Sequence, residues 1–281
     1  MAWVWLVLLY GALKGVRDVA KKKAVQKSGA LDVLLLYTLL SFLLVLPDAK
    51  NAMGLTAPQL GLTAIKSFVI FVGWLCGFYA LERMPVSLYG VLDLSQMLFT
   101  TLLGVICLGE RMLPAQIAGL VLVTGGLLML RGRGGLQKSE PVPIKVIGMA
   151  MVCYLFNAIS GTMDKVLMRD MTSSQLQFWY MLFLCLWYAV YMLVRRIPFH
   201  WKNALKNHWI WIMAVLFVIG DRALFMANGM EGSRVTVMTL LKQIGCVVTI
   251  IGGRIVFKEK NIGYKLLCAG VVIAGIVIAV L

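Results

Sequence analysis

The sequence predicts an all-α integral membrane protein with ten transmembrane helices arranged as two inverted five-helix repeats. Hydrophobic residues make up 61% of the 281 residues and charged residues only 14%, whereas soluble domains are about half apolar and about a quarter charged. Long apolar segments separated by short polar connectors run along the whole chain. This composition excludes the soluble globular classes and predicts a multi-pass membrane protein.

The basic residues and the cysteines exclude two further classes. Lys and Arg number 27 against 12 Asp and Glu, but they lie mostly between the apolar segments, which is typical of connectors that orient a chain in a bilayer and not of a nucleic-acid-binding face. The six cysteines all lie inside apolar segments, without CxxC spacing or neighbouring histidines. We therefore expect small buried thiols, no disulfide framework, no metal, no cofactor and no nucleic-acid partner.

Ten segments are long enough to cross a membrane. A bilayer core of about 30 Å needs about 20 helical residues. The N-terminal segment has no charged residue before it and no small-residue cleavage site after it, so it is interpreted as a spanning helix and not as a signal peptide. The predicted spans are residues 2–20, 30–46, 60–81, 87–108, 113–130, 144–166, 175–194, 209–229, 236–257 and 262–281.

The two halves of the chain align with each other. Residues 132–143 have the composition of a linker, and they separate a first five-helix repeat, residues 1–131, from a second, residues 144–281. An offset of 149 places Glu82 on Glu231 and needs no gap over the following forty-odd residues. An odd number of spans in each half gives the halves opposite orientations, which predicts an inverted repeat.

The segment LGERMLPAQIAGLVLVTGGLLML, residues 108–130, has a Gly-Glu pair with glycines nine and sixteen residues after the glutamate. It resembles the fourth-to-fifth helix region of EamA-type transporters in the drug/metabolite transporter superfamily. In the second half, Glu259 keeps its spacing to the last glycine and Cys268 replaces the first. The resemblance covers essentially the whole chain and implies ten helices in two inverted halves. The family's proline in the fourth and ninth helices is replaced by Met97 and Cys246, so the sequence carries no proline signal for a kink there.

Charged residues deep in the apolar segments mark the candidate site. A charge in hydrocarbon costs ~2.5 to 3.5 kcal/mol on insertion scales unless it faces protein or water. At about 1.5 Å per residue, Lys14, Asp221 and Arg222 lie roughly 18 Å into their helices. Asp93 and Lys242 lie roughly 9 Å into theirs. Each of these residues is therefore a functional candidate.

Other acidic residues lie nearer the helix ends. Asp18 and Asp164 are equivalent in the two halves, and we expect them to be solvated. The glutamates at the ends of the segments are interpreted as loop or cap residues that fix the connections: Glu82, Glu110, Glu231 and Glu259.

Asp93 and Lys242 occupy equivalent positions under the offset of 149. Because they enter from opposite faces, they should lie about 12 Å apart along the membrane normal, which suits two groups on either side of a small solute. A structural ion pair across the repeat interface is the alternative. With the polar residues that share their helix faces, the predicted substrate-binding residues are Tyr10, Lys14, Asp93, Gln96, Thr100, Asn157, Asp221, Arg222, Thr239 and Lys242.

Together, the deep charges and the resemblance favour a secondary transporter that moves a small polar, charged or zwitterionic metabolite by alternating access. Its partners would be the small-molecule substrate and the lipid bilayer, with protons as the candidate coupling ion, and its location the plasma (inner) membrane. An enzyme is not expected, because the only two histidines lie in one connector. The alternatives are a flippase for a lipid-linked head group or a non-catalytic membrane subunit.

The orientation of the chain stays open. Counted with the adjoining ends of the spans, the odd-numbered connectors hold sixteen Lys and Arg and the even-numbered connectors six. The positive-inside rule then puts both termini outside, whereas the resemblance implies that both lie inside.

Overall fold

A computed structural model of the chain describes residues 2–100, 103, 114–131, 142–230, 238 and 241–280. All regular elements in these ranges are helices. In the first half they are α1 (Ala2–Lys27), α2 (Ala30–Val45), the 3₁₀ helix η1 (Leu46–Ala52), α3 (Ala57–Glu82), α4 (Val86–Asp93) and α6 (Pro114–Arg131). In the second half they are α7 (Ile144–Leu167), α8 (Ser173–Val194), α9 (Trp201–Leu205), α10 (His208–Asn228), α12 (Ile244–Phe257) and α13 (Ile262–Val280).

Within the described ranges, five segments are long and apolar enough to cross a membrane. They are Ala30–Ala52, Ala57–Glu82, Ile144–Asp164, Ser173–Val194 and His208–Asn228. The predicted all-helical membrane class is therefore confirmed, while ten spans stay a prediction. α1 is as long as α3, but it carries charged residues in its middle and last third, which lower its hydropathy.

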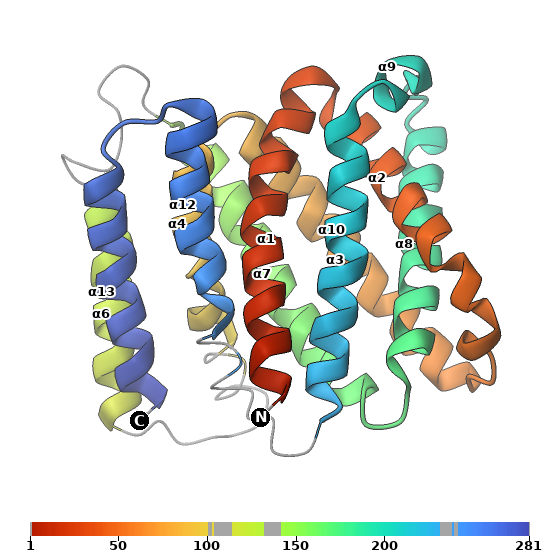
Figure 1. Cartoon of the computed structure of the whole chain (residues 1–281), viewed down its shortest axis with the longest axis horizontal. Coiled ribbons are helices and arrows are strands. Elements are labelled where there is room, and N and C mark those ends of the chain that lie inside the picture. The colour runs from red at the N-terminus through yellow and green to blue at the C-terminus, as the bar shows by residue number, and fades with distance from the viewer. Residues whose placement is uncertain are drawn as a thin grey trace.

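The helices form one bundle in which the two halves of the chain interleave (Figure 1). α1 packs against α10 and α12, α3 against α7, α4 against α12, and α6 against α13. α1 begins and α13 ends at the same end of the bundle (Figure 1). The interface between residues 1–131 and 144–281 therefore runs through the interior, where the charged residues of α1 meet the second half.

Small residues allow two of these contacts to be close. A Cβ atom at Gly15 of α1 would lie 2.6 Å from the carbonyl oxygen of Gly245 on α12. A Cβ atom at Gly90 of α4 would lie 2.8 Å from a methyl carbon of Thr249, also on α12. Glycines at such crossings let membrane helices approach until their backbones touch.

Two of the predicted helices are interrupted at their charged residues. α4 ends at Asp93, residues 94–95 form a turn, and the chain is helical again over 96–100. The amides of Leu94 and Ser95 bond to carbonyls three residues back, at 3.1 and 3.0 Å, which tightens the turn. In the second half a turn at Gln243 directly follows Lys242 and precedes α12. The prediction of a continuous helix over 87–108 is therefore wrong at residues 94–95, and neither break contains a proline.

Candidate functional site

A cavity of about 560 Å³ lies between helices of both halves. Residues of α1, α2, α3 and α4 line it from the first half, and residues of α7, α8 and α10 together with Lys242 line it from the second. Aromatic side chains also line the cavity. The charged residues that line it are Lys14, Arg17, Asp18, Lys21, Lys66, Asp93, Asp164, Asp221 and Lys242.

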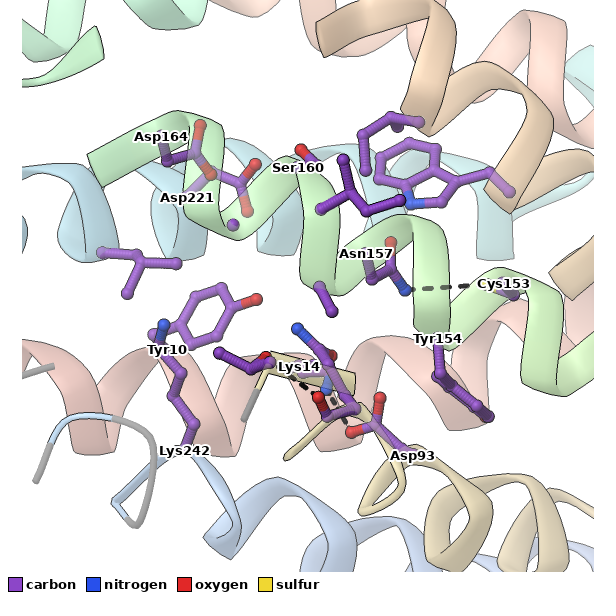
Figure 2. A pocket seen from close by; sticks show the side chains of 18 of the residues that line it. Tyr10, Lys14, Asp93, Cys153, Tyr154, Asn157, Ser160, Asp164, Asp221 and Lys242 are labelled. Atoms are coloured by element: carbon purple, nitrogen blue, oxygen red, sulfur yellow. Dashed lines mark hydrogen bonds and ion pairs between the residues drawn. The ribbon is translucent and has the colours of Figure 1, made fainter. Parts of the chain in front are cut away.

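Lys14 of α1 forms an ion pair with Asp93, as Figure 2 shows. Asp93 is the last residue of α4, where the unbonded carbonyl groups of a helix end make a carboxylate unfavourable. The Lys14 ammonium offsets that cost. The alternative considered from the sequence was an ion pair of Asp93 with Lys242 across the repeat interface; in the structure Asp93 pairs with Lys14.

Asp164 and Asp18 are not solvated, which corrects the sequence prediction. Asp164 of α7 lies 3.1 Å from the Lys66 ammonium, which also lies 3.8 Å from the centre of the Tyr180 ring. Asp18 is 4% exposed and lies 3.0 Å from Lys21, one turn further along α1. Burial of both carboxylates is tolerated because each one has a lysine partner.

Arg17 was missed by the sequence analysis, and it is the least well paired of the cavity cations that have a partner. Its Nη1 lies 3.8 Å from the Asp221 carboxylate, and its guanidinium lies 4.8 Å from the centre of the Phe217 ring. The Nε is buried and has no hydrogen-bond partner among the described residues. Helical spacing in the sequence could have identified Arg17, because Tyr10, Lys14 and Arg17 lie on one face of α1.

Lys242 reaches the same cavity from the second half. Its ammonium lies 5.7 Å from the centre of the Tyr10 ring, beside which Figure 2 shows it. Among the described residues no carboxylate forms an ion pair with it. The predicted residues Gln96, Thr100 and Asn157 also line the cavity.

Arg222 does not line the cavity, which corrects its assignment. It pairs with Asp48 of η1 and donates a hydrogen bond of 2.9 Å to the Ser174 hydroxyl. Adjacent residues of a helix point about 100° apart, so Asp221 faces the cavity while Arg222 faces a separate apolar groove. Thr239, also predicted, lies outside the described residues.

A comparison with known protein families finds a match in the first half of the chain. Residues 1–132 match the EamA-like transporter family. The resemblance noted at residues 108–130 lies within this match and is confirmed. The EamA-like match indicates a membrane transporter of the drug/metabolite transporter superfamily, and the apolar helices indicate a multi-pass integral membrane protein.

Other comparisons extend the likeness in fold. A solved crystal structure of a protein is similar to this chain with a TM-score of 0.59 and 16% identity, covering 96% of each chain. At this identity the match shows a likeness in fold over nearly the whole chain and nothing more. No curated protein matches the chain in sequence. In the part of the chain that the structure describes, no group of His, Cys, Asp or Glu side chains could hold a metal ion, and the described cysteines are free thiols.

Proposed function

We propose that this protein is a secondary transporter that moves a small charged metabolite by alternating access around the central cavity. The observation that carries the proposal is the cavity of about 560 Å³ lined by charged residues of both signs. Charged side chains inside a membrane protein are costly and typically mark a solute or ion pathway. The volume suits a small metabolite, since ligand pockets span about 300 to 1,000 Å³.

The proposed architecture is ten spans in two inverted five-helix repeats, residues 1–131 and 144–281, joined by the linker 132–143. The two helix breaks support it, because Asp93 and Lys242 are equivalent under the offset of 149 and each precedes a turn. Irregular backbone inside a membrane is tolerated where it lines a cavity, and interrupted helices in equivalent positions are typical of binding sites in inverted-repeat transporters.

The proposed site comprises the predicted residues that line the cavity. Carboxylates there could exchange protons during transport, so a proton remains the proposed coupling ion, and the plasma membrane the proposed location. The charged lining argues against a lipid as cargo, because acyl chains favour apolar walls. The proposed substrate-binding residues are Tyr10, Lys14, Asp93, Gln96, Thr100, Asn157, Asp221 and Lys242.

Uptake of radiolabelled metabolites into proteoliposomes tests the proposal. The panel would contain monocarboxylates, amino acids, amines and neutral amides, with empty liposomes as the background. We expect protein-dependent uptake of at least one class, and a loss of about tenfold or more in Asp93→Asn and in Lys242→Met. The matched control is the double variant Asp48→Asn with Arg222→Gln, which removes an ion pair outside the cavity.

Two results would contradict the proposal in different ways. Undiminished uptake in both cavity variants would refute the site. A monodisperse, folded protein that takes up no member of the panel would refute the transport function.

A further inference from the structure

We infer that the transported solute is an organic anion with one net negative charge, and that the guanidinium of Arg17 binds its carboxylate. This inference rests on the proposed transport function and narrows the substrate class of the same cavity. Three observations carry it: the charge balance of the lining, the missing partners of Arg17, and the rings that surround the guanidinium.

The described lining of the cavity has one more cation than carboxylates. Three lysines match three carboxylates one to one, in the pairs Lys14–Asp93, Lys21–Asp18 and Lys66–Asp164. This leaves Asp221 to face two cations, Arg17 and Lys242. A buried charge without a counter-ion is strongly destabilising. A solute with one negative charge would neutralise the excess, whereas a cation would double it.

Among the cavity cations that have an ion-pair partner, Arg17 uses the least of its hydrogen-bonding capacity. Its side chain is 9% exposed, and its distance of 3.8 Å from Asp221 is beyond hydrogen-bond range. Its Nε has no hydrogen-bond partner in the described part of the chain. A guanidinium has five N–H donors in a planar fork that matches a carboxylate in bidentate geometry. A bound carboxylate would supply the acceptors that Asp221 does not.

Lys242 is placed to add a longer-range attraction for the same anion. Its ammonium lies beside the ring of Tyr10, which is seven residues before Arg17 on one face of α1 and therefore about 10 Å away along the helix axis. Lys242 therefore lies close to the helix that carries Arg17, although it belongs to the second half of the chain.

The rings near Arg17 favour an organic anion over an inorganic one. Tyr37, Trp74 and Phe217 all line the cavity, and their ring centres lie 5.1 to 5.7 Å apart. Phe217 is also the ring over which the Arg17 guanidinium lies. A carboxylate bound at the guanidinium would bring its hydrocarbon body against these rings, where apolar contact is favourable.

The test compares matched compounds that differ in charge. Phenylacetate, phenylacetamide, phenethylamine and zwitterionic phenylalanine share a similar body, as do lactate, lactamide and alanine. In proteoliposomes at neutral pH, we expect protein-dependent uptake of a monocarboxylate at least tenfold faster than uptake of its amide, amine or amino-acid counterpart. Arg17→Gln should raise the KM for that acid by about 10- to 100-fold, since hydrogen bonds to a charged group contribute about 1.5 to 3 kcal/mol.

Arg17→Lys is the second variant, because it keeps the charge and removes the planar fork. We expect it to weaken transport of the acid by an intermediate factor. If either variant is not monodisperse, the selectivity of the wild-type protein between the acid and its uncharged, cationic and zwitterionic counterparts tests the anion assignment by itself.

The outcomes separate this inference from the proposed function. Preferred uptake of amides, amines or zwitterions would overturn the anion assignment while leaving the transporter in place. A KM unchanged in Arg17→Gln would overturn the role of Arg17. Absence of uptake for the whole panel would overturn the proposed function and this inference with it.

Discussion

The α3–α4 corner, residues 81–87, and the central cavity both bury charged side chains, but only the corner gives each of them its full set of partners. The Lys22 ammonium donates hydrogen bonds to the carbonyl oxygens of Leu81, Glu82 and Met84, at 2.6, 2.9 and 2.9 Å. In the cavity, Arg17 has an unpaired Nε and Lys242 has no ion-pair partner among the described residues.

Glu259 completes the corner from the second half of the chain. Its carboxylate accepts hydrogen bonds from the backbone amides of Val86 and Ser87, at 2.8 and 3.2 Å, and lies 3.2 Å from the Lys265 ammonium. The α3–α4 and α12–α13 connections lie at the end of the bundle opposite the termini (Figure 1). Buried charges with all partners satisfied stabilise the fold, whereas the unused donors of the cavity are the groups that the proposed solute would bind.

Glu259→Ala should have the largest effect on stability. It removes the cap of α4 and leaves the Lys265 ammonium, whose side chain is 4% exposed, without its carboxylate. Breaking a buried pair from one side costs about 3 to 5 kcal/mol. Thermal unfolding in detergent would show a lower midpoint. Glu82→Ala is the matched control, because Glu82 is exposed; equal shifts in the two variants would contradict the structural role of Glu259.

Lys22→Met should be the next most damaging change. It leaves carbonyl groups at the end of α3 without donors, and an unsatisfied buried group costs about 1 to 3 kcal/mol. The same unfolding measurement applies, with Lys27→Met as the control because Lys27 is exposed at the end of α1. A midpoint that matches the wild-type protein would show that the corner does not depend on Lys22.

Most of the residues that were predicted from the sequence line the cavity, but the pairing of its charges was not predicted. Lys14, Asp93, Asp221 and Lys242 were selected by their depth in the predicted spans, because a charged residue within an apolar segment can be recognised from the sequence alone. Pairing is a property of neighbouring helices, so the Lys14–Asp93 contact could not be deduced. Glu259 was predicted to be a loop or cap residue that fixes a connection, and its carboxylate accepts hydrogen bonds from the start of α4 in the other half.

Lys242→Met should separate function from stability. The Lys242 ammonium is desolvated and has no ion pair among the described residues, so its charge disfavours the folded state. Its removal should therefore leave the unfolding midpoint unchanged or slightly raised. Uptake should nevertheless fall about tenfold, since about 1.4 kcal/mol of attraction for the solute is lost. A large fall in the midpoint would instead place Lys242 with the corner residues, as part of the fold.

Asp221→Asn should have the smallest and most informative effect. Asp221 competes with an anionic solute for Arg17, so Asp221→Asn should lower the KM for a monocarboxylate. We expect a decrease of about fivefold, or about 1 kcal/mol, if the Asp221 carboxylate lies about 7 Å from the bound solute in a partly hydrated cavity. Asp48→Asn is the matched control, because it also removes the carboxylate partner of an arginine, but outside the cavity. It should leave that KM unchanged. A higher KM in Asp221→Asn would mean that the carboxylate holds a positive group of the solute, which would favour a zwitterion over an anion.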